Sequence, residues 1–288
     1  NTMNNVAIDY SDKITLTSDR ITNLPVTSVA DLLEYVIGIN IIKRGSGDAN
    51  ASISAFGGTS QNVLILIDGF RITTDYTIYH DLNFPFGIED ISKIEVSHGS
   101  NSRLYGSRAV SSIINIVTKD AQTTKNTINF LTGTQPGNYG AIHNNITLNI
   151  PTGHSNHLLS INDLGTSGVN QGADPYQQLS LYYKYIIENG ANKTHMSFGY
   201  LDRINSDTTS LNTYRYTKNT SKFVNSKIRW NFPNKRLESN FHWNNNIYSI
   251  NPIAGQTTAD TSEANFIGYG FNGFFNNKFG LTQIGLLI

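Results

Sequence analysis

The segment Asn62–Phe70, with the sequence NVLILIDGF, places five consecutive aliphatic residues directly before a turn. A short aliphatic run bounded by polar residues is typical of a strand that is buried on both faces. Asp68-Gly69 is a strong hairpin signal, because both residue types tolerate the positive φ of a two-residue turn. Phe70-Arg71-Ile72 begins the return strand. The segment therefore predicts a buried strand followed by a tight turn.

The residues before this segment predict one helix between two strands. Lys13–Thr17 alternates apolar and polar residues, as a short strand does. Ser28 and Asp31 have the spacing of a capping box, in which each side chain satisfies a backbone donor at a helix start. The apolar face of that helix consists of Val29, Leu32, Leu33 and Val36. Gly38 suits the end of the helix, and Ile39–Ile42 predicts the next strand.

The residues after the segment continue the mixed pattern. Ile88–Ile91 predicts a helical turn, and both Ile94–Val96 and Ile113–Thr118 predict strands. Arg44–Ser52 and Thr73–Leu82 are polar and without periodicity, so we expect loops there. The first part of the chain thus predicts a small mixed α/β domain.

The composition changes near Asp120. Residues 1–120 contain 9 Lys+Arg and 13 Asp+Glu, a net charge of −4, whereas residues 121–288 contain 12 and 8, a net charge of +4. Asn rises from 10 residues in the first part to 26 in the second. We therefore expect two domains, 1–120 and 121–288. A net charge of zero argues against nucleic acid as a partner, and the absence of cysteine excludes disulfides and thiolate chemistry.

Residues 121–288 alternate apolar and polar side chains with the period of two that strands have. Ala141–Ile150 is the clearest example, because its Ile and Leu residues fall on one face and its His and Thr residues on the other. The same pattern recurs in Lys193–Leu201, Arg236–Ile247 and Glu263–Asn276. These runs have about the length that crosses a bilayer when a strand is tilted. We expect about nine antiparallel strands after residue 125.

The predicted connections between these strands alternate in length. Longer loops are expected near 132–140, 165–177, 204–221 and 248–264. Tight turns are expected near Pro151–Ser155, Asn189–Asn192, Pro233–Lys235 and Asn276–Lys278. Alternation of short turns and long loops is typical of bacterial outer-membrane barrels. The alternative is a soluble β-sandwich, whose strands also alternate apolar and polar residues.

Five segments of the first domain occur in an order and spacing that resemble the plug domain of TonB-dependent outer-membrane receptors. They are Ser28–Ile39 (SVADLLEYVIGI), Asn62–Phe70 (NVLILIDGF), Ile88–Val96 (IEDISKIEV), Leu104-Tyr105-Gly106 and Ile113–Lys119 (IINIVTK). The resemblance covers roughly residues 8–120, and the layout is most similar to vitamin B12 (cobalamin) and siderophore receptors. It implies a plug domain followed by transmembrane barrel strands in the bacterial outer membrane. Family members have 22 strands, so the barrel here is expected to be incomplete, and the chain to be a fragment or one part of a split receptor.

The sequence departs from the family pattern at several plug positions. Ser54-Ala55 stands where an Arg-Gly pair is usual, and His98-Gly99-Ser100 stands where Arg-Gly-Pro is usual. Arg108 and Ser111-Ser112 replace small glycines. A larger residue where glycine lets two backbones approach costs free energy unless the site has opened. We therefore expect compensating changes around these positions, or impaired transport.

The resemblance implies that two plug loops face outward and touch the ligand. The predicted ligand-binding residues offer short polar groups or aromatic surface with polar tips, which suit a large polar ligand. They are Ser46, Asp48, Asn50 and Ser52 in the first loop, and Asp75, Tyr76, Tyr79 and His80 in the second. The alternative is that both loops are solvated and have no role in binding.

No catalytic or metal constellation emerges from the sequence. His154 and His157 have an HxxH spacing but no third ligand, and Gly99–Ser107 lacks the Lys-Ser/Thr end of a phosphate loop. We therefore expect no enzyme, no resident metal and no cofactor. Calcium in the outer loops is a weak alternative that rests on Asp174, Asp207 and Asp260.

The resemblance implies a receptor that binds a scarce large ligand, a corrinoid or a ferric siderophore, and imports it with energy from TonB. The expected partners are TonB with its inner-membrane energising complex, outer-membrane lipid, and a small-molecule or metal-chelate ligand. TonB would pull an N-terminal box, which we do not identify within Asn1–Tyr10. The alternatives are a TonB-dependent glycan importer and a non-transporting surface binding protein of the adhesin or lectin kind.

Overall fold

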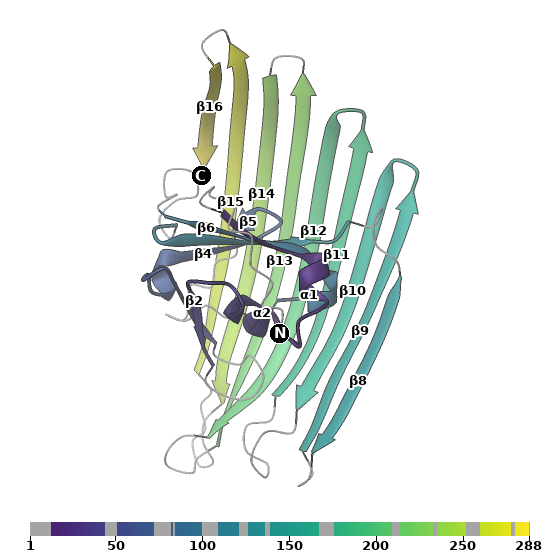
Figure 1. Ribbon diagram of the computed structural model, residues 1–288, viewed down its shortest axis with the longest axis vertical. Coiled ribbons are helices and arrows are strands. Elements are labelled where there is room, and N and C mark those ends of the chain that lie inside the picture. The colour runs from purple at the N-terminus through teal and green to yellow at the C-terminus, as the bar shows by residue number, and fades with distance from the viewer. Residues whose placement is uncertain are drawn as a thin grey trace, which may run out of the picture.

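The computed structural model describes residues 13–43, 51–71, 82, 84–99, 109–120, 126–135, 139–166, 176–208, 214–232, 235–251, 260–277 and 280–287. A small mixed domain, Lys13–Thr118, lies across one face of a large antiparallel sheet, Thr127–Leu287 (Figure 1). We call the small domain the plug and the large sheet the wall. The fold class predicted from the sequence is confirmed.

The plug is built on a five-stranded sheet with the order β1-β6-β7-β4-β5. Its strands are β1 (Lys13–Thr17), β4 (Val63–Ile67), β5 (Phe70–Arg71), β6 (Ile91–His98) and β7 (Ser112–Thr118). All five residues of β4 are buried, and β4 pairs in parallel with β7. Asp68 and Gly69 join β4 to β5 with φ of 51° and 82°, so the predicted turn is confirmed.

Two short helices and a hairpin complete the plug, together with the 3-10 turns η1 (Ser60–Asn62) and η2 (Ile88–Asp90). These elements are α1 (Ser18–Ile21), α2 (Val29–Glu34), β2 (Ile39–Ile42) and β3 (Ser52–Ala55). At the start of α2, Ser28 Oγ accepts a hydrogen bond from the Asp31 amide at 3.0 Å, as predicted. The Asp31 carboxylate accepts from the Thr27 amide at 3.4 Å, one residue earlier than a capping box places it. The sequence did not predict α1, because four residues contain only about one helical turn.

The wall has nine antiparallel strands in its described residues, each paired with its neighbours in sequence. They are β8 (Thr127–Gln135), β9 (Tyr139–Thr152), β10 (Ser155–Thr166), β11 (Tyr176–Asn189), β12 (Asn192–Thr208), β13 (Tyr214–Phe232), β14 (Lys235–Asn251), β15 (Asp260–Asn277) and β16 (Gly280–Leu287). Two-residue connections, 153–154, 190–191, 233–234 and 278–279, alternate with the longer connections 136–138, 167–175, 209–213 and 252–259. The predicted strand number and alternation are therefore confirmed.

The strands are longer than the sequence predicted. The loops expected over 204–221 and 248–264 shrink to 209–213 and 252–259, because β12 continues to Thr208 and β14 to Asn251. The end of β12, residues 205–208, is polar on both faces, and the end of β14 has only Tyr248 and Ile250 among polar residues, so neither shows a long apolar alternation. The backbone ladder with the neighbouring strand nevertheless continues through them. Asp207 and Asp260, predicted to lie in loops, are therefore strand residues.

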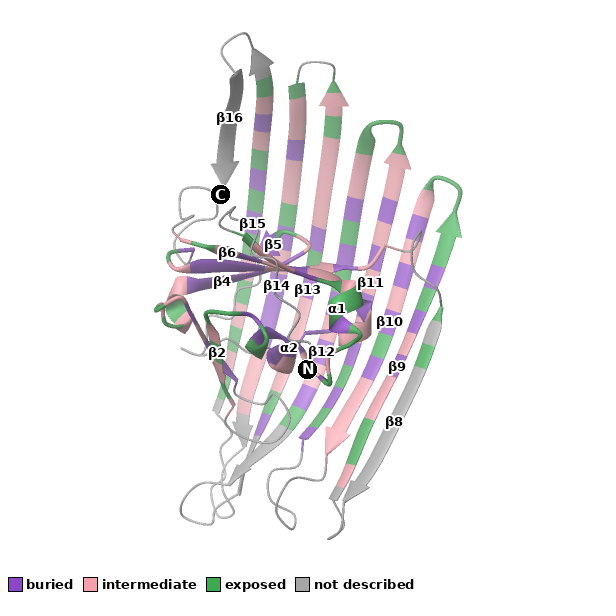
Figure 2. Cartoon of the chain, in the orientation of Figure 1, coloured by how far each residue is buried: buried purple, intermediate pink, exposed green. Residues whose placement is uncertain are grey.

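Buried and exposed residues alternate along the wall strands (Figure 2), and their types reverse the pattern of a soluble sheet. Many of the wall's apolar side chains are exposed on the face away from the plug: Ile142, Leu148, Ile150, Ile161, Leu179, Met196, Phe198, Val224, Trp230, Phe241, Ile267, Tyr269, Phe271 and Phe275. Its buried side chains on the other face are largely polar and include Asn145, Thr147, Ser160, Asn162, Gln178, Lys184, Ser197, Asn225 and His242. A soluble sandwich would bury the apolar face, so this pattern contradicts that alternative and fits a membrane wall.

The exposed face of the wall is itself divided into two bands. On β14, outward side chains are mostly apolar from Leu237 to Trp243, and Asn245 follows. Asn245 donates to Glu263 at 2.7 Å and to Asn265 at 2.8 Å, within a polar band near the longer connections. From Lys235 to Asn245 the strand rises roughly 33 Å at ~3.3 Å per residue. Tilted by ~40°, that length covers an apolar band ~25 Å tall.

No helix in the part of the chain that the structure describes is long and apolar enough to span a bilayer.

The apolar band gives a matched test on one strand. Phe271→Arg should lower the free energy of unfolding by about 2–4 kcal/mol, because the cation is placed in the middle of the lipid-facing band. Asn265→Arg, on the same strand and face but in the polar band, should change it by less than about 1 kcal/mol. Urea unfolding of the protein in lipid vesicles measures both values, and equal losses in the two variants would contradict the assignment of the bands.

Glu95 on β6 makes the stability of the edge strand β1 depend on pH. Its carboxylate meets Lys13 at 2.9 Å and Lys93 at 2.7 Å and accepts from Asn115 at 3.1 Å. Partial burial alone would raise the pKa of Glu95, but these partners outweigh it and lower the pKa from 4.5 to about 2. Since the folded pKa is the lower one, the stabilisation is present above pH 4.5 and is lost as the pH falls toward 2.

Hydrogen exchange of the β1 amides tests this dependence. In the wild type, we expect protection of β1 to fall between about pH 4.5 and 2, after correction for intrinsic exchange. In Glu95→Gln, which cannot ionise, protection at neutral pH should be lower and its loss on acidification smaller. Exchange in α2, which does not contact Glu95, serves as the internal control.

Candidate functional site

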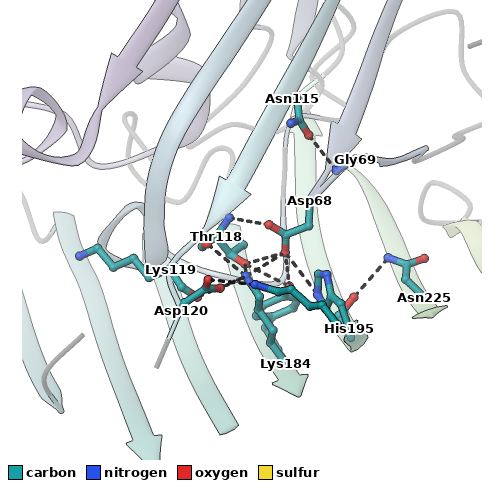
Figure 3. Close-up of polar contacts among 12 residues, drawn as sticks. Asp68, Gly69, Asn115, Thr118, Lys119, Asp120, Lys184, His195 and Asn225 are labelled. Carbon is teal, nitrogen blue, oxygen red and sulfur yellow. Dashed lines mark hydrogen bonds and ion pairs between the residues drawn. The ribbon is translucent and has the colours of Figure 1, made fainter. Parts of the chain in front are cut away.

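The functional geometry that the structure describes lies where the plug meets the wall. The turn after β4 points its carboxylate at the wall, and the end of β7 lies beside it (Figure 3). Asp68 Oδ1 accepts from the Thr118 amide at 2.9 Å. Asp68 Oδ2 accepts from Thr118 Oγ1 at 2.6 Å and from the Tyr182 hydroxyl of β11 at 3.0 Å. This Asp68 cluster therefore ties two plug strands to one wall strand.

Lys184 supplies the cation of the Asp68 cluster. Its ammonium is 3.5 Å from Asp68 Oδ2 and 2.9 Å from Asp120, and it donates to the Thr118 carbonyl at 3.1 Å. The side chains of Lys184 and Asp68 are only 4% and 3% exposed, so both charges are removed from water. Complete burial would raise the pKa of Asp68, but Lys184, His195 and the Thr118 hydrogen bonds outweigh it and lower the pKa. Asp68 is therefore held as a carboxylate against the wall.

Asp90 forms a second anchor with different chemistry. It is fully buried at the end of η2, and its carboxylate accepts from Thr147 Oγ1 of β9 at 2.6 Å and from Ser160 Oγ of β10 at 2.5 Å. The Gly87 amide donates to it at 3.0 Å and the Asn145 amide at 3.5 Å. Burial raises the pKa of Asp90 despite these hydrogen bonds. The hydrogen-bond donors of this Asp90 anchor are all neutral, whereas the Asp68 cluster contains an ion pair.

Aromatic contacts fill the space between the two anchors. Phe86 of the plug meets the Tyr182 ring edge to face at 5.2 Å, and Tyr182 lies 6.4 Å from Phe223 of β13. Gly199 lets the plug approach this surface, since a Cβ there would lie 2.8 Å from Pro85 and 2.4 Å from Phe223. The apolar core of the plug therefore continues into the wall at Leu158, Tyr182 and Phe223.

One departure from the family pattern is compensated in the plug itself. Ser111 stands where a glycine is usual, and it faces Gly58, where a Cβ would lie 2.2 Å from Ser111 Oγ. Ser111 Oγ also donates to the Asn62 carbonyl at 2.9 Å. At another departure, the His98 ring contacts Phe56 edge to face at 4.7 Å. Arg108 lies outside the described residues.

The predicted ligand-binding residues are mostly outside the described part of the chain. These residues are Ser46, Asp48, Asn50, Asp75, Tyr76, Tyr79 and His80. Ser52 is described: it begins β3, is 8% exposed, and its Oγ donates to the Ile42 carbonyl at 3.4 Å. Ser52 thus has a partner within its own hairpin, and its role in ligand binding stays a prediction.

The structure also places residues that were weighed as metal ligands. His157 Nδ1 is 2.8 Å from the Tyr183 hydroxyl, on the exposed face of the wall. Asp174 lies outside the described residues, and Asp207 and Asp260 are on strands. Calcium binding in the outer loops stays untested.

Sequence reasoning missed the anchors between plug and wall. Asp68 was identified only as a turn residue, and Asp90 only as part of a helical turn. Lys184 carried a signal, because it is a lone cation within the otherwise apolar and aromatic end of β11, LYYKYII. A lone charge in such a strand needs a buried partner.

Comparison with known proteins identifies sequences that are similar to the plug. The model of the TonB-dependent receptor plug domain matches residues 8–113. The vitamin B12 transporter BtuB of Vibrio vulnificus is 33% identical over 101 residues, which are 35% of this chain and 16% of that protein. BtuB of Photobacterium profundum is 30% identical over 103 residues, which are 36% of this chain and 17% of that protein.

Solved receptors match the fold over almost the whole chain. A mutant of the ferric enterobactin receptor PfeA from Pseudomonas aeruginosa has a TM-score of 0.73 at 14% identity, covering 95% of this chain and 48% of that one. The siderophore receptor PirA from Acinetobacter baumannii has a TM-score of 0.60 at 14% identity, covering 96% and 56%. The chain thus spans about half the length of these receptors. The resemblance predicted from the plug motifs is confirmed.

Removing Lys184 tests the ionic anchor. Lys184→Met should destabilise docking of the plug by about 3–5 kcal/mol, because it leaves the Asp68 carboxylate buried without its cation. Adding Asp68→Asn to this variant should recover a large part of that loss. Limited proteolysis of the plug and urea unfolding measure the effect.

The control for this experiment is Lys193→Met. Lys193 is about one-third exposed and pairs with Glu188 at 2.8 Å on the same side of the wall, and it lies 3.9 Å from the half-exposed Asp120. Its loss should cost less than about 1 kcal/mol. A cost for Lys184→Met no greater than that of the control would contradict the anchor.

Proposed function

We propose a transport function for this chain, which has the plug domain and the wall strands of a TonB-dependent outer-membrane receptor. In this proposal it is part of a receptor that binds a corrinoid or a ferric siderophore outside the cell and imports it with energy from TonB. The observation that carries the proposal is a plug domain docked through buried polar and aromatic contacts on the inner face of a wall whose outer face is apolar.

The two ends of the wall support an orientation in the outer membrane. In barrels of this type, short turns face the periplasm and long loops face outward. The two-residue connections thus mark the periplasmic end, and the polar band around Asn245 and Glu263 lies toward the outside. In Figure 1, β2 extends from the plug toward the end of the wall with the longer connections. The hairpin of β2 and β3 is therefore on the side from which a ligand would arrive.

The ligand class rests on two kinds of support. The predicted plug loops combine Tyr and His rings with short polar groups, which suits a large ligand that has apolar and polar surface. The names of similar proteins include vitamin B12 transporters and ferric enterobactin receptors. The vitamin B12 transporters match this chain only in the plug sequence, and the ferric enterobactin receptors match it only in fold. We therefore propose the ligand class that includes both vitamin B12 and ferric enterobactin: scarce, large metal chelates.

The plug architecture supports an N-terminal pull by TonB as the driving event. Among the described strands, β1 is at the edge of the plug sheet, where it pairs with β6 over five residues. A pull on the residues before Lys13 therefore loads β1 first. Docking through hydrogen bonds and ion pairs is consistent with a plug that rearranges, since both partners can be rehydrated when they separate.

Binding measurements on the full-length protein test the proposal. The detergent-extracted, heat-modifiable protein should bind either cyanocobalamin or ferric enterobactin, followed by tryptophan quenching or calorimetry. Tyr76→Ala combined with Tyr79→Ala should weaken that binding by about tenfold or more, since two aromatic contacts are lost. Tyr269→Ala, on the lipid-facing side of β15, is the matched control and should leave the affinity unchanged.

Three outcomes contradict parts of the proposal. A protein that stays soluble and monomeric without detergent would exclude the receptor. Binding of an oligosaccharide in place of both chelates would indicate a glycan importer. Binding without uptake in cells that have active TonB would indicate a surface binding protein.

A further inference from the structure

The exposed face of the wall carries a hollow near the two-residue connections. It has a volume of about 290 Å³ and is lined by Leu148, Ile150, Thr152, His157, Leu159 and Tyr183. These residues come from β9, β10 and β11, and all project away from the plug. Leu148 and Ile150 are 37% and 53% exposed, so the aliphatic floor has no protein cover within the described residues.

Polar atoms border this hollow at the end nearest the turn 153–154. His157 Nδ1 shares a hydrogen bond with the Tyr183 hydroxyl at 2.8 Å, and His157 Nε2 lies 3.5 Å from Ser155 Oγ. Ser155 Oγ is 2.5 Å from Thr152 Oγ1. The His157 ring also lies 4.9 Å from the ring of Tyr185. A chain of hydroxyl and imidazole groups therefore runs along one side of an aliphatic surface.

The position of the hollow along the strands identifies the membrane leaflet. On β10, the outward side chains run from Ser155 and His157 at the turn, through Leu159 and Ile161, to Asp163. Asn144 donates to Asp163 at 3.5 Å at the opposite end, where the polar band begins. The hollow thus lies in the half of the apolar band next to the two-residue turns. In the proposed orientation this is the periplasmic leaflet, which consists of glycerophospholipids.

We propose that this hollow is a binding site for one glycerophospholipid of the periplasmic leaflet. One acyl chain lies on Leu148, Ile150 and Leu159, and the ester or phosphate oxygens accept hydrogen bonds from the polar border. The occupant must join an apolar chain to a polar head, because the aliphatic floor and the polar border are parts of the same hollow. The Nε2 atom of His157 is suited to the head group, since its contact with Ser155 is long. This inference rests on the proposed placement in the outer membrane.

Filling the hollow tests the site. Leu159→Trp should occupy the space of the acyl chain, whereas Leu179→Trp adds the same bulk to β11 at an exposed apolar position outside the hollow. Each protein is purified from membranes in detergent and washed, and its bound phospholipid is measured by phosphate assay and mass spectrometry. We expect the wild type and Leu179→Trp to retain about one phospholipid per protein more than Leu159→Trp retains.

A second variant tests the head-group contact without adding bulk to the floor. His157→Phe keeps an aromatic ring beside Tyr185 but removes the imidazole nitrogens. We expect it to retain less phospholipid than the wild type, and this measurement stands even if Leu159→Trp does not fold. Melting temperatures with added phosphatidylethanolamine should rise for the wild type and rise less for His157→Phe.

The outcomes separate this inference from the proposed function. Equal phospholipid in the wild type, Leu159→Trp and His157→Phe would falsify the site and leave only non-specific lipid around the wall. An equal loss in Leu159→Trp and Leu179→Trp would also overturn it, because the loss would not depend on the hollow. A protein that requires no detergent would instead contradict the proposed membrane location.

Discussion

The ion pair between Asp68 and Lys184 joins the two parts of the molecule, and much of the remaining geometry follows from it. The turn that carries Asp68 needs two residues with positive φ, and Asp-Gly satisfies that need while pointing a carboxylate at the wall. Both charges lose water when the plug docks, so their attraction is largely offset by desolvation. Separation of the plug returns water to both. The contact therefore fixes where the plug lies while contributing less to its retention than an apolar contact of the same size would.

The wall has a different constraint: its backbone N–H and C=O groups must all be hydrogen-bonded where no water is present. In hydrocarbon each strand must pair on both sides, and the ladder in the described wall runs without interruption from β8 to β16. The side chains on the two faces of the wall are then in different environments. Outward residues such as Phe271 face lipid, and inward residues such as Asn145 face the plug. The low charge and the abundance of Asn and aromatic residues in the sequence follow from this division.

The sequence predicted the elements well and their contacts poorly. Val63–Ile67, the Asp68-Gly69 turn, the Ser28 cap and the two-residue connections were predicted because each depends on neighbouring residues. The lengths of β12 and β14 were underestimated, because their outer ends are rich in polar residues and show too short an alternation to distinguish them from loops. The partners of Asp90, in contrast, are Thr147 and Ser160, 57 and 70 residues away. No local sequence pattern connects a carboxylate to hydroxyl groups that lie so far away along the chain.

The two anchors hold different ends of the plug sheet with different chemistry. Asp68 follows β4 at the β5 end of the sheet and is held by an ion pair, whereas Asp90 directly precedes β6 and is held by neutral donors. β6 is also the strand that pairs with β1. A load applied to β1 therefore passes to β6 and reaches the Asp90 anchor before it reaches the Asp68 cluster. The pKa of Asp90 is raised because burial penalises the charged form of its carboxyl. A load on β1 thus meets the neutral hydrogen bonds of Asp90 first and the ion pair of Asp68 and Lys184 second.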